Sequence, residues 1–257
     1  MAAVTYAGTT WDTNAGNKTV VATPAVGDAI IVIAASSGLA GGTTAVSDNQ
    51  AVAATYTQID VDYTGFSTTG VLTAWVRDRL ITAASSTTWT ATQAASSGGG
   101  LGVIRISGIS IVGLGSIRGC GGQSTGTAGT TPAPVLLRRV GTTFSGTQAA
   151  LTGNVVISAA CNGATAASFT VRSSPVYTED FDNGYSVPGT GLCVSHIASG
   201  ETASTITWGG TSATAFASIA FEVDATVPQY SWVGDAAAIN RHMNDIQQGA
   251  LGRSNTR

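Results

Sequence analysis

Charge is scarce in this sequence: of 257 residues only 10% are Asp, Glu, Lys or Arg, and Lys18 is the only lysine. Soluble domains ordinarily contain about a quarter charged residues. The formal net charge of −3 leaves no basic excess for nucleic-acid binding. The surface must therefore be made of Thr, Ser, Gly, Asn and Gln. Such a surface favours a protein packed in an assembly or displayed outside a cell over a freely diffusing enzyme.

Targeting and membrane segments are also missing from the sequence. The N-terminus has neither the basic nor the apolar region of a secretory signal, so we expect no signal-dependent export. No apolar run reaches the roughly 18 residues of a membrane span, so we expect no membrane partner.

Cysteine is rare, with Cys120, Cys161 and Cys193 only, and no Cys-x-x-Cys pair exists. An odd number leaves at least one cysteine unpaired within the chain. Two interpretations stay open: three inert, buried thiols, or an intermolecular disulfide through Cys120, which lies in a glycine-rich segment.

Motifs of catalysis are lacking as well, and we predict neither an enzyme nor a cofactor. The only histidines are His196 and His242, and there is no Gly-x-Ser-x-Gly motif to mark a nucleophile. The stretch Gly113-Leu114-Gly115-Ser116 resembles a phosphate-binding loop only superficially, because no helix is expected after it.

What the sequence does contain is an internal repeat with a period near 120 residues. Tyr56 precedes Gly70 by 14 residues, and Tyr177 precedes Gly191 by 14 residues. A Thr-rich segment with a tryptophan, Trp89 or Trp208, follows in each copy. A repeat this long indicates two tandem domains rather than a solenoid.

Short, β-branched segments bounded by Gly, Pro, Asn and Ser recur in both copies and predict an all-β protein. We expect two tandem jelly-roll-like β-sandwiches followed by a short C-terminal helix and arm. The predicted strands are 18–22, 28–34, 54–60, 71–77, 87–92, 101–107, 135–139, 154–159, 168–172, 192–196, 204–208 and 217–223.

The predicted domains are 1–112 and 135–226, joined by a Gly/Thr-rich linker over 113–134. The tail, 227–257, differs in character from the repeat. Ile239, Met243 and Ile246 fall on one face of a short helix, which is marginal alone and needs a partner surface. We expect this face to dock either on its own domain or, as a partner-binding anchor, on a neighbouring subunit.

Acidic residues gather once, in Glu179-Asp180-Phe181-Asp182-Asn183-Gly184. Asn-Gly predicts a turn. The alternative is a fragment of a calcium loop with Asp180 and Asp182 as weak candidate metal ligands. A glycosidase site with paired carboxylates is less favoured, because it needs an aromatic-lined cleft and aromatic residues make up 7% of the chain.

The residues Gly27-Asp28, Tyr56-Thr57, Ala74-Trp75-Val76, Thr88-Trp89-Thr90 and Ile104–Gly108 carry a resemblance. Together they are similar to β-sandwich domains of tailed-bacteriophage virion structural proteins and of some bacterial surface proteins. A weaker copy of the pattern covers 153–223.

The resemblance implies a virion structural protein, made in the host cytoplasm and located on the exterior of the phage particle. A head decoration (cement) protein, without enzymatic activity, is the favoured type. It would bind the major capsid protein or other virion subunits and form a homo-oligomer, with a trimer favoured. The alternatives are a tail or neck component, an adhesin that binds host glycan, and, less favoured, a carbohydrate-active enzyme.

Overall fold

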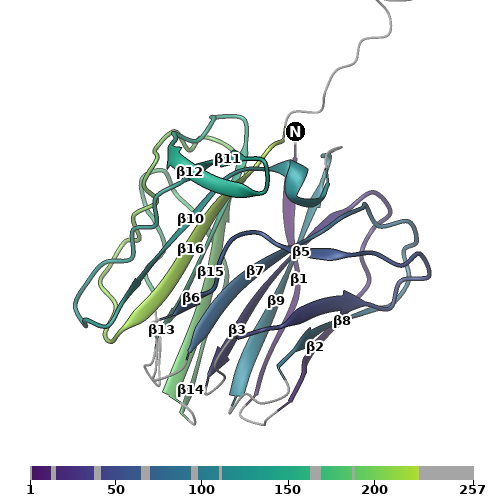
Figure 1. Ribbon diagram of the computed structural model, residues 1–257, viewed down its shortest axis with the longest axis horizontal. Coiled ribbons are helices and arrows are strands. Elements are labelled where there is room, and N and C mark those ends of the chain that lie inside the picture. Colours follow the sequence, from purple (N-terminus) through teal and green to yellow (C-terminus); the bar gives the residue numbers. More distant parts are fainter. Residues whose placement is uncertain are drawn as a thin grey trace, which may run out of the picture. The chain divides into compact units, whose positions relative to one another are not determined.

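The computed structural model describes residues 2–12, 16–37, 42–64, 70–93, 98–109, 112–162, 169–186 and 189–225. Residues 1–226 form one compact unit (Figure 1). Its described part is all-β, as predicted, with a single 3-10 turn, η1 (Gly113–Ser116). We call residues 2–109 the first half and residues 112–225 the second half.

Three antiparallel sheets make up the fold. Sheet A, in spatial order, contains β1 (Ala3–Asp12), β9 (Gly98–Ser107), β3 (Ala29–Ser37), β7 (Val71–Arg77) and β5 (Tyr56–Gln58), with β6 (Tyr63–Thr64) also beside β7. Sheet B contains β2 (Lys18–Ala22), β8 (Thr87–Thr92) and β4 (Ala45–Asp48). Sheet C contains β12 (Thr143–Thr147), β11 (Leu137–Val140), β10 (Ile117–Thr125), β16 (Phe216–Val223), β13 (Val155–Asn162), β15 (Gly189–Ile197) and β14 (Thr178–Ser186).

The internal repeat of the sequence is accompanied by a repeat of strand order. Sheet A runs β1-β9-β3-β7-β5, and the corresponding part of sheet C runs β10-β16-β13-β15-β14. The registers also agree, because Ile30 faces Arg105 in the first half as Val156 faces Glu222 in the second. In the first half, successive strands from β1 to β5 alternate between sheets A and B. This alternation is compatible with a jelly-roll-like sandwich, which stays a prediction.

The second half has its own counterpart of sheet B, although its segments are too short or irregular to count as strands. Backbone amides of Ile206 and Trp208 donate to the carbonyl oxygens of Pro134 and Pro132, each at 2.9 Å. The Gly209 amide donates to the Thr170 carbonyl at 2.8 Å. Segments 132–136, 204–209 and 169–172, which we call the outer segments, therefore pair with one another. Their buried apolar side chains pack against sheet C, so they cover it as sheet B covers sheet A.

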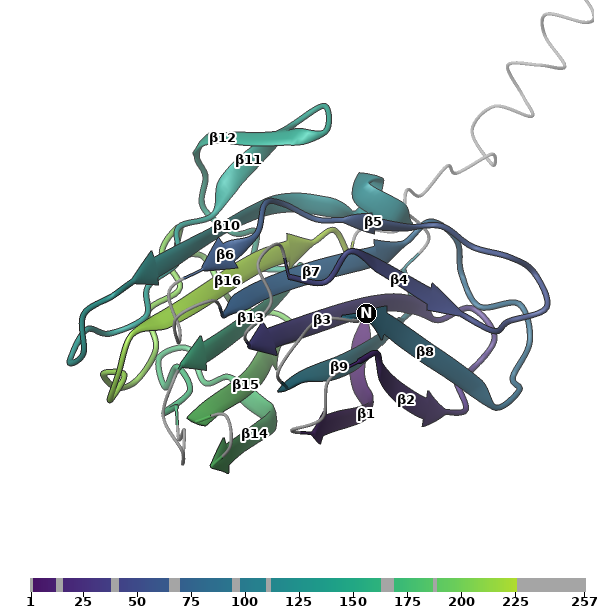
Figure 2. The same ribbon diagram turned by 60° about the horizontal axis from the view of Figure 1, so that its bottom comes forward.

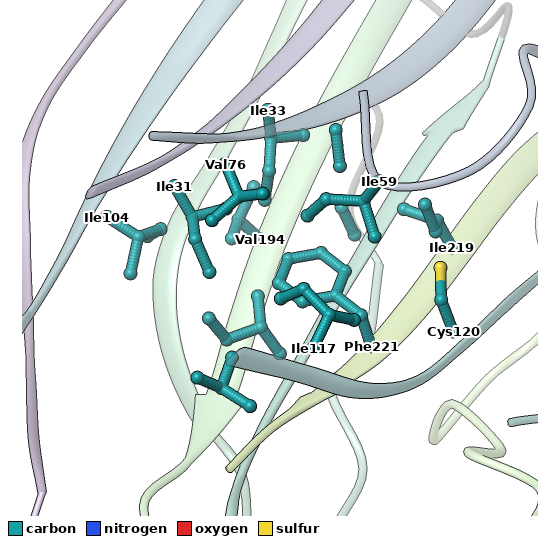
Figure 3. Close-up of a cluster of buried hydrophobic side chains, with 14 of the residues drawn as sticks. Ile31, Ile33, Ile59, Val76, Ile104, Ile117, Cys120, Val194, Ile219 and Phe221 are labelled. Atoms are coloured by element: carbon teal, nitrogen blue, oxygen red, sulfur yellow. The ribbon is translucent and has the colours of Figure 1, made fainter. Parts of the chain in front are cut away.

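Four layers result, in the order sheet B, sheet A, sheet C and outer segments (Figure 1). The largest apolar cluster lies between sheets A and C and draws twelve buried residues from each half. Figure 3 shows side chains of β3 and β7, including Ile33 and Val76, packed against Val194, Ile219 and Phe221 of sheet C. The two halves thus share a core, so the predicted domain boundaries do not separate two independent cores.

The inner strands β3, β7 and β13 of the two central sheets are buried on both faces, and the sequence reflects this. Ile31 and Ile33 of β3 face sheet C, while Ile30, Val32 and Ala34 face sheet B. A strand covered on both faces is a continuous apolar run rather than an alternation of apolar and polar residues. β8 is covered on one face only and does alternate between buried and half-buried positions.

The linker predicted over 113–134 is wrong for its first part, which forms η1 and β10. β10 pairs with β16 and β11, and its Ile117 and Cys120 belong to the shared core. Its glycines serve close packing rather than flexibility. A Cβ on Gly122 would overlap the ring of Tyr63 from the first half, and one on Gly121 would overlap the carbonyl oxygen of Val135.

Other elements also depart from the prediction. Strands β1, β4, β6, β12 and β14 are not among the predicted strands. Of the predicted strands 168–172 and 204–208, the described residues 169–172 and 204–208 make backbone hydrogen bonds without forming regular strands. The acidic segment predicted as a turn lies in β14, where a bulge between Glu179 and Phe181 interrupts the pairing with β15. The turn prediction is therefore wrong. Asn-Gly here falls inside a strand, because the hairpin reverses only after Ser186.

Candidate functional site

The feature that most distinguishes the second half is a hairpin formed by β11 and β12. In the first half, six residues, 23–28, connect β2 to β3. In the second half, eighteen residues, 137–154, connect the outer segment 132–136, which takes the place of β2, to β13. The extra chain forms this hairpin, which stands out from the sheets in Figure 2. Most side chains of β12 are exposed, as expected for the edge strand of sheet C.

A cleft of about 240 Å³ lies at the base of this hairpin. Its lining comes from η1, β10, the hairpin and the end of β16, namely Gly115, Arg118, Arg138, Arg139, Gln148 and Asp224. We call it the hairpin cleft. It gathers three of the eleven basic residues of a chain whose overall charge is negative.

Arg139 is held in place by backbone carbonyls rather than by an acid. Its Nε donates to Ile117 O at 2.8 Å, and its two terminal nitrogens donate to Gly141 O at 3.2 Å and Gly115 O at 3.3 Å. Carbonyl oxygens satisfy donors without cancelling the charge. Arg139 therefore fastens the hairpin to η1 and β10 while it keeps its full positive charge.

Arg118 is fastened differently, to the buried carboxylate of Glu222. Its Nη1 donates to Glu222 and to Ala149 O, the latter at 2.9 Å. Glu222 is fully buried and also accepts from Gln148 Nε2 at 3.1 Å, Leu151 N at 2.8 Å and Asn154 Nδ2 at 2.7 Å. A buried carboxylate needs this number of donors to offset its desolvation.

Arg138 differs from both, because it is exposed and no hydrogen bond or ion pair joins its side chain to another residue in the described ranges. With Asp224 and Glu222 as the nearby acids, the three arginines leave one positive charge in excess, 3 − 2 = 1. None of these residues was singled out in the sequence. The adjacent Arg138-Arg139 pair in so uncharged a chain was the available indication.

The corresponding position in the first half has the opposite arrangement of charge. Arg105 takes the place of Glu222, and its Nε donates to Asp28 Oδ2 at 2.6 Å. Asn154 takes the place of Asp28. The hairpin, the buried acid Glu222 at the position of Arg105, and the arginine-lined cleft thus all belong to the second half.

The weak metal candidates Asp180 and Asp182 contact different elements of the second half. Asp180 contacts His196, whose Nδ1 lies 2.7 Å from Oδ2 and 2.9 Å from Oδ1. Asp182 accepts a hydrogen bond from Phe169 N at 3.3 Å. The role of Asp180 and Asp182 as metal ligands stays a prediction.

Asp182 has a different set of neighbours that could hold a metal ion, namely Glu179 and Cys193, with the three ligand atoms within 4.8 Å of one another. Burial, together with the nearby acids, raises the pKa of the Cys193 thiol well above its usual value. A protonated thiol is a poor metal ligand. Glu179 is exposed, so the group has an open side.

The three cysteines are all free and buried. Cys120 has no exposed surface, and burial raises the pKa of its thiol far above the ordinary range. The predicted intermolecular disulfide is therefore wrong for the folded chain. Cys161 and Cys193 belong to different clusters on opposite faces of sheet C, so they do not face each other.

The predicted partner-binding residues Ile239, Met243 and Ile246 lie outside the described residues, as does His242. The docking of that helix stays a prediction. Within the described ranges, no helix has the length and apolar character needed to cross a membrane.

Comparisons with protein-family models, with curated proteins and with solved structures find no match for this chain.

Proposed function

We propose that this chain is a structural protein of a phage particle, a decoration or cement protein on the capsid exterior, without enzymatic activity. The observation that carries the proposal is the distribution of charge. Buried or half-buried ion pairs join Arg77 to Asp48, Arg105 to Asp28, Arg118 to Glu222 and Arg172 to Glu201. The only lysine, Lys18, is 1% exposed.

These charged residues form ion pairs inside the molecule, so they contribute little to the charge of its surface. The remaining hydroxyl-rich and apolar surface has a low desolvation cost when it packs against another protein. This suits a protein that bridges neighbouring capsid subunits and resists internal pressure, with the major capsid protein as partner. Self-association, a trimer being favoured, follows from the same surface.

The double-sided burial of sheets A and C supports the same proposal. A four-layer stack with a shared core resists shear between its halves better than two sandwiches on a linker, because separation would expose twenty-four apolar residues. A part of a particle that is under mechanical stress needs this kind of stiffness.

A second candidate is a tail- or neck-associated protein that binds a host-surface glycan. The protruding β11–β12 hairpin favours it, because loops carried on a rigid sandwich commonly form recognition surfaces.

Copy number and location on intact particles test the proposal. Particles purified from cultures that produce this chain would be quantified by mass spectrometry against the major capsid protein and imaged by electron cryomicroscopy. We expect hundreds of copies, with density for the four layers on the outer face of the shell. A few dozen copies at the tail would favour the second candidate. Absence from purified particles would refute both.

A further inference from the structure

We infer that the hairpin cleft binds a single oxyanion, a carboxylate or a phosphate-type group, through Arg138 together with Arg118 and Arg139. Nothing in the proposed structural role requires this site. The inference depends on the geometry of the cleft and not on where the protein is located.

Unused donors are the first argument. The Arg138 side chain has no hydrogen-bond or ion-pair partner among the described residues. Among the described residues, the hydrogen bonds of the Arg118 side chain all involve Nη1, which leaves Nε and Nη2 available. Guanidinium groups present their donors as a planar fork that matches the two oxygens of a carboxylate or phosphate.

Preorganisation is the second argument. Arg118 is fixed by Glu222 and Ala149, and Arg139 is fixed by three carbonyls, so only Arg138 must be ordered when a ligand binds. Ordering a long side chain is one of the main costs of binding. A cleft with two arginines already in place therefore binds an anion more tightly than three freely moving arginines would.

Size and charge set the class of ligand. The volume of about 240 Å³ is below that of ordinary small-molecule pockets, so it suits one anionic group. Asp224 also lines the cleft and would repel a second negative charge. The cleft therefore selects a single anionic group and disfavours a polyanion such as a nucleic acid.

The first half provides the third argument, by contrast. Its equivalent position pairs Arg105 with Asp28 directly and lacks the inserted hairpin. The cleft lies where the second half differs from the first by the inserted hairpin. We expect a new site at such a difference between two copies of one strand order.

Titration by two-dimensional NMR on the full chain tests the inference. Phosphate, sulfate and succinate would be added in separate arms, with chloride at matched ionic strength as the control. We expect saturable shifts of the amides of Gly115, Arg138 and Gln148 with at least one of the oxyanions and none with chloride. A preference for phosphate and sulfate would point to a phosphate-type ligand, and a preference for succinate to a carboxylate from a protein or metabolite.

Arg138→Gln should weaken the binding about tenfold, since it removes one charge-assisted interaction. Because Arg138 is exposed, the variant should stay folded, and Arg138→Glu should abolish binding. Arg79→Gln, at an exposed arginine outside the cleft, is the matched control and should bind like the unaltered chain. Shifts that are equal in chloride, or that persist in Arg138→Glu, would overturn the inference.

Discussion

The two halves of the molecule bury their polar groups in different ways on the same strand order. In the first half, Arg77 and Asp48 form an ion pair at 2.7 Å, with side-chain exposures of 0% and 2%. Tyr56 donates to the same carboxylate at 2.8 Å, and Trp89 Nε1 donates to the Tyr56 hydroxyl at 2.9 Å. Arg77 also donates to the carbonyls of Arg79, Leu80 and Val52, which completes a closed network.

The corresponding network of the second half is more open. Tyr177 donates to Glu201 at 3.1 Å, and Arg172 Nε lies 3.0 Å from the same carboxylate without hydrogen-bond geometry. The Arg172 side chain is 16% exposed. Trp208, the counterpart of Trp89, packs edge-on against Phe169, and its Nε1 has no hydrogen-bond partner in the described part of the chain.

This difference shows that strand order and polar networks are specified separately. The order of the strands is preserved by apolar faces that must be covered, and many apolar residues satisfy that need equally well. A buried ion pair requires each donor and acceptor to be matched, so a single substitution changes the whole network. The polar groups of the two halves could therefore diverge while the sheets kept their order.

Separating the halves should have the largest effect. A fragment of residues 1–112 would expose one face of sheet A, which includes Ile31, Ile33, Leu72, Val76 and Ile104. We expect it to aggregate or remain unfolded in circular dichroism and size-exclusion chromatography, whereas the full chain unfolds in a single calorimetric transition. A soluble, folded, monomeric fragment would show that each half is independently stable.

Breaking the closed network should cost more than breaking the open one. Asp48→Asn leaves Arg77 buried without its counter-charge, which destabilises a protein by about 3–5 kcal/mol. Glu201→Gln should cost about 1–2 kcal/mol less, because Arg172 can be rehydrated. Urea unfolding of both variants measures the difference. Equal losses would mean that the two networks are energetically alike.

The paired tryptophans provide a finer comparison. Trp89→Phe and Trp208→Phe remove similar volume, but only the first removes a hydrogen bond, that to Tyr56. We expect Trp89→Phe to be more destabilising by about 0.5–1.5 kcal/mol, the net contribution of one hydrogen bond, because the Tyr56 hydroxyl keeps its bond to Asp48. A larger loss for Trp208→Phe would contradict this assignment and would indicate a partner for its indole.

Chemical labelling should have the smallest effect of these tests, because the reactive side chains of both halves are buried. Lys18 and the three cysteines are buried, so amine reagents should not modify Lys18 in the native chain and thiol reagents should not react. Burial raises the pKa of Cys120 and Cys161, which keeps these thiols protonated when the pH rises to about 9, above the ordinary cysteine pKa. Mass spectrometry before and after denaturation checks this, and rapid native labelling of one cysteine would identify a half that opens.

The strands with the clearest composition were predicted well. β2, β7 and β8 begin and end where expected, because β-branched and aromatic residues bounded by turn residues are a local property. β10 and β14 were missed for a physical reason. The glycines of β10 accommodate Tyr63 and Val135, and the acids of β14 lie on an edge strand, and neither environment can be read from neighbouring residues.

The sequence by itself determined the all-β class, the repeat and most of the central strands, because apolar patterning and repeat spacing act over short stretches of chain. Only the tertiary structure decided that the halves share a core, that Cys120 is buried, and that Arg118, Arg138 and Arg139 meet at one cleft. These features depend on segments distant in sequence, such as Tyr63 against Gly122 and Arg118 against Glu222. Their closeness follows from how distant strands pair and how the sheets stack, which local composition does not specify.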